Sequence, residues 1–195
     1  MKIMAWITAS ILTAYALLSC FPLSGEEAIY DNMIRLHVIA QSDSAADQAE
    51  KLQVRDAVLA CIGNAMEAST VFDTARAAVT EMIPSIEEAA RAVTGAPVTV
   101  TLGKETYPVR QYEGFTLPAG EYTSLRVILG EGEGQNWWCV LFPRLCTARA
   151  VKDSFYEDFI AAGFTPEQYR IIKNESGVKY KIRFKILEIL SGWGK

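Results

Sequence analysis

Metal-binding residues are scarce in this chain. Its 195 residues include one histidine, His37, and four cysteines, and no two cysteines form a C-x-x-C pair. Structural zinc sites are built from about four Cys, His or carboxylate ligands, and C-x-x-C is their usual sequence signal. We therefore expect no metal site and no cofactor.

Positive charge is also in short supply. The chain has 19 Lys and Arg against 23 Asp and Glu, a formal net charge of −4 and a pI of about 5.2. The electric field of a negatively charged protein repels the phosphate backbone of nucleic acids, whose binding depends on clustered Lys and Arg. We expect no nucleic-acid partner.

Motifs of known enzymes are missing as well. The sequence has no G-x-S-x-G and no H-E-x-x-H. The glycine stretch 130–134 is interrupted by Glu131 and Glu133 and lacks a following Lys-Ser/Thr, so it predicts a hairpin loop and not a phosphate cradle. His37 could act as a general base with Ser42, Asp43 or Ser44, but helix capping already explains these residues. We expect no catalytic residue, although a hydrolase acting on cell wall or peptide remains an alternative.

The first 25 residues are typical of an export signal. Met1-Lys2 precede an uncharged apolar run from Ile3 to Phe21, which is close to the length that spans a bilayer. The segment predicts a signal peptide or an N-terminal membrane anchor and places residues 26–195 outside the cytoplasm. Residues 17–20, Leu-Leu-Ser-Cys, resemble a lipobox, which makes Cys20 a lipidation candidate and membrane association an open question.

Residues 26–195 have the composition of one globular domain. Half of the residues are apolar, and no interior linker rich in Pro, Ser or Gly divides the chain. Outside the cytoplasm, Cys139 and Cys146 are disulfide candidates, and Cys61 would then be a buried free thiol.

The N-terminal half predicts one strand and two helices. Alternating apolar residues in 34–39 predict a half-buried strand with Arg35 and His37 on one face. The capping residues 41–44 then start a helix at about 45–66. Leu52, Leu59, Ile62 and Met66 form its expected core stripe, with Asp47, Lys51 and Arg55 on another face. A second helix is expected at about 71–93, ended or kinked at Pro84.

The C-terminal half predicts hairpins. Segments 98–102 and 107–112 would pair around a turn at Gly103-Lys104, and segments 122–129 and 136–142 would form a second hairpin. A short helix is expected at 151–162. The fold class is α+β, with an N-terminal strand and two helical segments packed on an antiparallel sheet of hairpins in a single domain.

A last strand is expected at 178–186. Its basic row, Lys179, Lys181, Arg183 and Lys185, is typical of a soluble edge strand, and contact with anionic lipid or an acidic partner is the alternative.

The sequence resembles the stage II sporulation protein R family in two blocks. The first block is Ile34-Arg-Leu-His-Val-Ile-Ala-Gln-Ser-Asp-Ser44, continued by Asp47-Gln48, Lys51-Leu52 and Val54-Arg55-Asp56. The second contains residues 118–122, Pro-Ala-Gly-Glu-Tyr, and 136–143, Asn-Trp-Trp-Cys-Val-Leu-Phe-Pro. Departures from the family pattern are small, at Gln41 and Arg144.

This resemblance implies an intercellular signal of endospore-forming bacteria. The forespore would export it into the space between the two septal membranes, where it activates a membrane aspartyl protease of the mother cell that cleaves the precursor of sigma factor E. We expect binding of this partner and no catalysis. An exported lipoprotein or ligand-binding module is the alternative.

Two patches are predicted to contact the partner. The tandem tryptophans should point to opposite faces of their strand, which leaves one indole available for a binding hot spot. The predicted contact residues are Arg35, His37, Asp43, Asp47, Lys51 and Arg55 around the strand-to-helix junction, and Arg126, Asn136, Trp137 and Trp138 on the hairpin.

Overall fold

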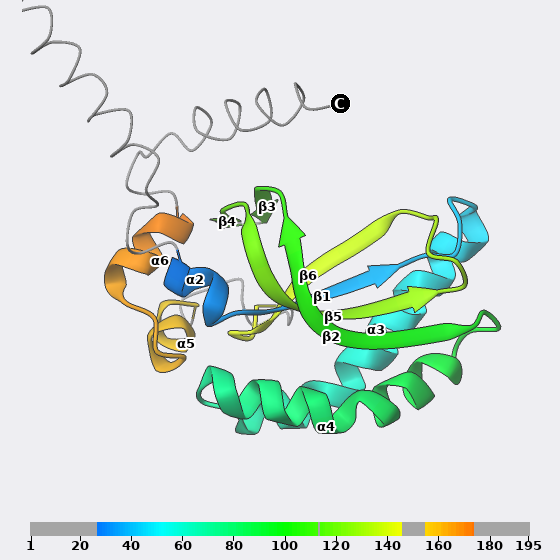
Figure 1. Cartoon of the computed structure of the whole chain (residues 1–195), viewed down its shortest axis with the longest axis horizontal. Helices are drawn as coiled ribbons and strands as arrows, with labels where there is room; N and C mark the ends of the chain where they lie inside the picture. The colour runs from blue at the N-terminus through cyan, green and yellow to red at the C-terminus, as the bar shows by residue number, and fades with distance from the viewer. Residues whose placement is uncertain (1–26, 113, 146–154, 174–195) are drawn as a thin grey trace, which may run out of the picture.

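The computed structural model describes residues 27–112, 114–145 and 155–173 (Figure 1). The expected export segment with Cys20, the cysteine at 146 and the expected strand 178–186 lie outside these residues. Within the described ranges, no helix has both the length and the apolar character needed to cross a membrane.

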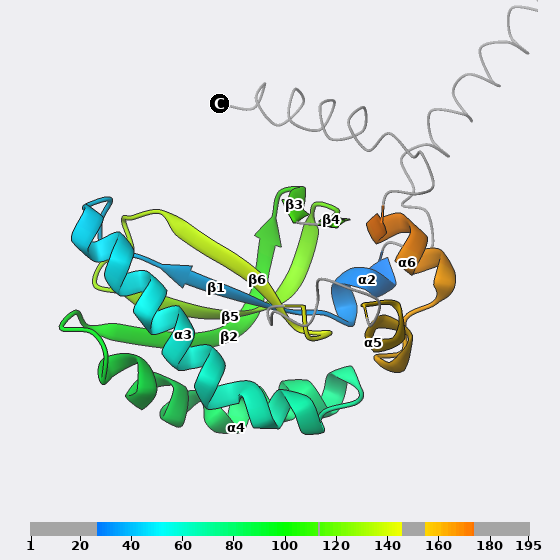
Figure 2. The ribbon, with the colours of Figure 1, turned by 180° about the vertical axis from the view of Figure 1, so that it is seen from behind.

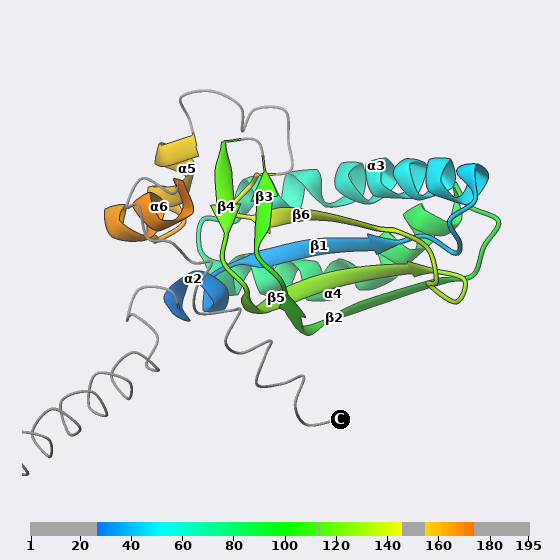
Figure 3. The same cartoon turned by 90° about the horizontal axis from the view of Figure 1, so that it is seen from above.

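A four-stranded sheet with the order β2-β5-β1-β6 organises the fold (Figure 3). These strands are β1 (Ile34–Ile39), β2 (Val98–Tyr107), β5 (Gly120–Leu129) and β6 (Asn136–Phe142). β1 runs parallel to β5 and antiparallel to β6, while β2 runs antiparallel to β5. The α+β class is confirmed, but the sheet is mixed and not antiparallel throughout.

The position of β1 changes the expected strand pairing. Every residue of β1 is buried, so the strand is not half-buried as its alternation predicted. A strand that needs cover on both faces and both edges belongs in the middle of a sheet. β1 therefore lies between β5 and β6, and the predicted hairpin of these two segments does not form.

β2 is one continuous strand of ten residues. Gly103 and Lys104 pair with Ser124 and Thr123 of β5, so the turn predicted at this dipeptide is wrong. The strand ends before Pro108, which has no N–H to donate to a ladder. A separate two-stranded hairpin follows, formed by β3 (Arg110–Tyr112) and β4 (Phe115–Leu117).

Two long helices cover one face of the sheet (Figure 2). α3 (Ala45–Ala68) begins at its N-cap Ser44, whose side chain accepts a hydrogen bond from the Asp47 N–H. Its core stripe is formed by Val54, Val58, Ile62 and Met66, one residue every four positions. Leu52 is 39% exposed, so the predicted stripe was wrong at its first position.

α4 (Phe72–Arg91) packs beside α3 and buries Ala75, Val79, Ile86 and Ala90. Pro84 lies inside this helix without ending it. The packed apolar face of α4 stabilises the helix on both sides of the proline.

Three short helices gather at the end of the sheet where β1 begins (Figure 1). They are α2 (Glu27–Asp31), α5 (Phe155–Ala161) and α6 (Pro166–Lys173). α5 falls within the predicted helix, whereas α2 and α6 were not predicted. Together with the β3–β4 hairpin, they enclose a second core on the sheet face opposite α3 and α4, formed by Ile29, Met33, Tyr107, Leu117, Tyr122, Val140, Leu145, Phe155, Phe159, Phe164 and Ile172.

The glycine-rich segment 130–134 packs against the connection between β1 and α3. The Gly134 N–H donates to the Ala40 carbonyl at 2.9 Å. A Cβ atom at Gly134 would lie 2.3 Å from the Ser42 carbonyl oxygen, so a side chain has no room there. The segment is a loop, as predicted, but it connects two strands that are separated by β1.

Candidate functional site

Polar side chains meet on the face of the sheet opposite α3 and α4, next to the second core. Across three neighbouring strands, Arg126 of β5, His37 of β1 and Trp138 of β6 are in register. Because cross-strand partners share a face, these three side chains form one row. We call the surface formed by His37, Glu105, Arg110, Arg126, Asn136 and Trp138 the polar face.

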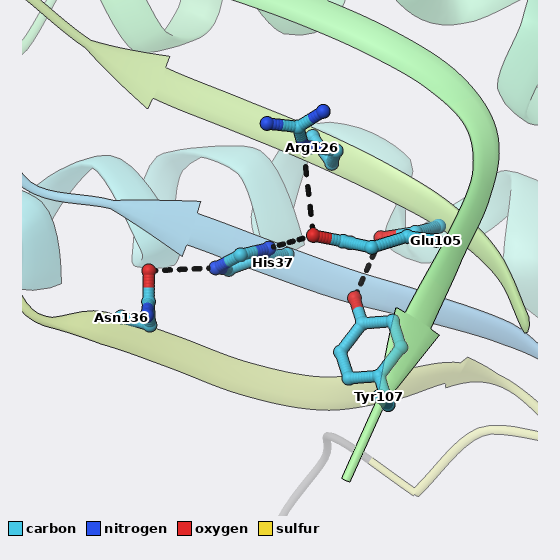
Figure 4. Close-up of polar contacts among 6 residues, drawn as sticks. His37, Glu105, Tyr107, Arg126 and Asn136 are labelled. Atoms are coloured by element: carbon cyan, nitrogen blue, oxygen red, sulfur yellow. Dashed lines mark hydrogen bonds and ion pairs between the residues drawn. The ribbon is translucent and has the colours of Figure 1, made fainter. Parts of the chain in front are cut away.

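His37 lies at the centre of this surface (Figure 4). Its Nδ1 lies 2.9 Å from Oε1 of Glu105, and its Nε2 lies 2.8 Å from Oδ1 of Asn136. Nε of Arg126 lies 3.7 Å from the same Glu105 oxygen. The histidine is 6% exposed, whereas the Arg126 side chain is 40% exposed and Asn136 is exposed. A buried polar centre therefore supports groups that solvent or a partner can reach.

Glu105 carries the negative charge of this network. Burial of its carboxyl group raises its pKa, but the hydroxyl groups of Ser124 and Tyr107, together with His37, stabilise the ionised form more strongly. The net result is a pKa of Glu105 below its ordinary value of 4.5. The phenol of Tyr107, whose oxygen lies 2.6 Å from Ser124 Oγ, has its pKa raised by burial.

Arg35 lies beneath the hairpin and is completely buried. Its Cζ lies 3.7 Å from the ring centre of Tyr107 and 4.9 Å from that of Tyr122. Its NH2 group donates to the hydroxyl of Tyr112 on β3 at 2.5 Å. Arg35 was predicted as a contact residue, but in this structure the tyrosines and the hairpin cover it. Its role here is to hold the hairpin to the sheet.

The tandem tryptophans point to opposite faces, as predicted. Trp138 lies on the polar face, 5.4 Å from the His37 ring, and the Arg110 guanidinium stacks on it with Cζ 3.6 Å from the ring centre. Trp137 packs against the core beneath the helices, and its indole lies 5.1 Å from Cζ of Arg55. Both indoles are half-buried.

The strand-to-helix junction serves a structural purpose. Asp43 Oδ1 accepts the Gln135 N–H at 2.8 Å, and Lys51 Nζ donates to the Gln135 carbonyl at 2.9 Å. Ser42 Oγ donates to the Asp47 carboxylate. Lys51 is 5% exposed, and this burial lowers its pKa although the charge of Asp43 opposes the shift. These residues hold the glycine loop against the start of α3.

The structure therefore separates the predicted contact residues into groups. His37, Arg126, Asn136 and Trp138 meet on the polar face. Asp43, Asp47 and Lys51 lie at the loop junction, and Arg55 contacts Trp137 on the helix side.

The arrangement around His37 does not resemble a catalytic triad with the serines that follow β1. Both ring nitrogens are already in contact with the side chains of Glu105 and Asn136. Ser42 and Ser44 are engaged in capping the start of α3. Within the described residues, no group of three or more His, Cys, Asp and Glu is placed to hold a metal ion. The side chains of this surface are instead held in place by contacts with one another.

Sequence reasoning missed several members of this site. Glu105 and Tyr107 were hidden because Gly103-Lys104 was interpreted as a turn, although their i, i+2 spacing is that of one strand face. Arg110 and Tyr112 lie on the small hairpin and reach the site because the hairpin packs over the sheet. No local sequence pattern predicts that position.

Two cysteines, Cys61 and Cys139, lie within the residues that the structure describes. Cys139 is disulfide-bonded, and because Cys146 lies outside the described residues, the predicted pairing stays a prediction. Cys61 is a free thiol that is half-buried, and burial raises its pKa.

Comparison with known proteins places the polar face within a matched region. The family model for stage II sporulation protein R matches residues 30–152, which include every member of the polar face. Stage II sporulation protein R of Bacillus subtilis (strain 168) is 37% identical over 123 residues, which is 60% of this chain and 55% of that relative. No solved structure matches the chain. The chain belongs to the stage II sporulation protein R family, whose name gives its members a role in sporulation.

Proposed function

We propose that this protein is an exported signal of endospore formation that binds and activates a membrane aspartyl protease of the mother cell. That protease then cleaves the sigma factor E precursor. In this proposal residues 1–25 direct export from the forespore, and residues 26–195 act in the space between the two membranes. The membership of the family supports the sporulation role.

The observation that carries the proposal is the preformed polar face. Of its accessible groups, Asn136 contacts the buried His37, Arg126 pairs with Glu105, and Trp138 is stacked against Arg110. Aromatic and arginine side chains supply much of the binding energy at protein interfaces, and groups that are already ordered lose less entropy on binding. A surface of this kind suits recognition of another protein.

Activation requires more than binding. A ligand shifts a protein toward its active state only to the extent that it binds that state more tightly. A shift from about 1% to about 99% active needs roughly 10⁴-fold preference for the active state. In this proposal the polar face makes its contacts with the active conformation of the protease.

The test is reconstitution of the purified exported domain with the membrane protease and the sigma factor precursor. We expect processing to depend on the domain and to fall about tenfold or more with Trp138→Ala, because an interface tryptophan often contributes 2 kcal/mol or more. Trp137→Ala is the matched control, since its indole faces the helices. Activity is compared only for variants whose circular dichroism spectrum shows a folded domain.

Three results would count against the proposal. Processing that proceeds equally without the domain would remove the activator role. Folded Trp138→Ala protein with full activity, while Trp137→Ala is inactive, would move the contact surface away from the polar face. Turnover of a peptide or cell-wall substrate by the purified domain would favour the enzyme alternative.

A further inference from the structure

The polar face carries more positive than negative charge. Arg110 and Arg126 lie on it, and Glu105 is the one carboxylate among the described residues that comes within ion-pair distance of either of them. Counting His37 as neutral, this leaves an excess of one positive charge on a protein whose formal net charge is −4. The surface therefore has the opposite sign to the molecule as a whole.

The carboxylate of Glu105 lies closer to His37 than to Arg126. Oε1 of Glu105 lies 2.9 Å from His37 but 3.7 Å from Nε of Arg126, which is beyond hydrogen-bond distance. Nε of Arg126 and Nε of Arg110 are buried and have no hydrogen-bond partner in the described structure. An incoming acceptor would therefore be bound by the terminal nitrogens of these guanidinium groups.

These two arginines are linked by a continuous chain of contacts. Arg110 stacks on Trp138, Trp138 lies beside His37, and Glu105 bridges His37 to Arg126. The chain crosses β6, β1 and β5, so it forms an elongated strip and not a compact pocket. An extended ligand that carries more than one negative charge suits this strip.

We infer that the polar face binds an acidic segment of the protein partner, with Arg126 and Arg110 each taking a carboxylate. This inference rests on the proposed function, because it names the chemistry by which the partner is recognised. Arginine is suited to the role because its planar group binds a carboxylate through two parallel hydrogen bonds. Trp138 covers one face of the Arg110 guanidinium and fixes its orientation.

The probe is a capped hexaglutamate peptide, compared with capped hexaglutamine at the same ionic strength. Binding is followed through the indole N–H resonances of the exported domain in ¹⁵N-resolved NMR. We expect hexaglutamate to shift the Trp138 resonance more than that of Trp137, and added salt to weaken binding because the charges are accessible. Hexaglutamine should leave both resonances in place.

Variants separate the polar face from general charge. Arg126→Gln and Arg110→Gln should each weaken hexaglutamate binding about tenfold, the effect of losing one charge-assisted contact. Arg91→Gln is the control, because Arg91 lies on α4 and its side chain is 59% exposed beside Glu87. It removes the same charge and should leave binding unchanged.

Binding of other anions provides a test that could overturn the inference. Binding to phosphatidylglycerol vesicles or to inorganic phosphate without binding to hexaglutamate would overturn it, as would equal affinity of all three variants. If Arg126→Gln abolishes processing while hexaglutamate binding is unaffected, the carboxylate inference fails and the activator proposal stands. If hexaglutamate binds as expected while processing is indifferent to the domain, the activator proposal fails and the anion site stands.

Discussion

Nδ1 of His37 lies 2.9 Å from Oε1 of Glu105, although 68 positions separate the two residues in the sequence. His37 belongs to the central strand β1 and Glu105 to the edge strand β2, with β5 between them. The contact therefore crosses a strand and depends on the pairing of β2 with β5 and of β5 with β1. It links the exposed Arg126 to the buried centre of the sheet.

Glu105→Gln should make stability less dependent on acid pH. The pKa of Glu105 is lowered in the folded protein, so its ionised form stabilises the fold above the ordinary pKa of 4.5. This contribution is lost as the pH falls through the folded-state pKa. We expect a lower free energy of unfolding for the variant at neutral pH, with a difference from wild type that shrinks in acid.

Urea denaturation followed by circular dichroism at a series of pH values measures this difference. Glu121→Gln, an exposed position at the start of β5, should change the free energy of unfolding by less than about 0.5 kcal/mol at neutral pH. A Glu105→Gln difference that stays constant from neutral to acid pH would contradict the role given to this carboxylate.

Arg35→Ala should destabilise the protein and loosen the hairpin. The substitution removes a fully buried side chain that stacks on Tyr107 and donates to Tyr112. Loss of packing and of cation–π contact predicts a decrease of about 2–4 kcal/mol in the free energy of unfolding. Amide hydrogen exchange in β3 and β4 should become faster than in β1. Arg91→Ala is the exposed control, and similar losses for both variants would show that burial of Arg35 is not the cause.

Lys51→Met should release the glycine loop. It keeps the length and packing of the side chain but removes the donor to the Gln135 carbonyl and to Gln48. Leaving such acceptors without their charged donor costs about 1–3 kcal/mol. We expect this decrease in the free energy of unfolding, with faster amide exchange at Gly134. Lys104→Met, at an exposed position of β2, should have a much smaller effect.

Gly134→Ala should be far more damaging than Gly103→Ala. A Cβ atom at Gly134 meets backbone atoms of Ser42, which cannot rotate away, whereas a Cβ atom at Gly103 meets nothing within 4 Å. Overpacking of this kind costs about 1–3 kcal/mol. Gly103→Ala should be neutral or stabilise by up to about 1 kcal/mol, since glycine is unfavourable inside a strand. Thermal unfolding of the two variants gives the comparison, and equal midpoints would contradict it.

Elements with strong local signals could be predicted. The alternation in residues 34–39 and the capping residues before 45 correctly placed β1 and α3, because these signals involve neighbouring residues only. The single glycine at 103 was a weak local signal for a turn. Ten regular pairs between β2 and β5 outweigh it, and no local pattern reports their presence.

The sequence by itself determined the α+β class, the family blocks, the opposite directions of Trp137 and Trp138, and four of the six residues of the polar face. Only the tertiary structure decided that β1 lies between β5 and β6 and that Arg35 is buried beneath a hairpin. The same order of strands places Glu105 beside His37. Strand order follows from burial summed over the whole sheet and both of its covers, so contacts between residues distant in sequence form only when the complete fold is assembled.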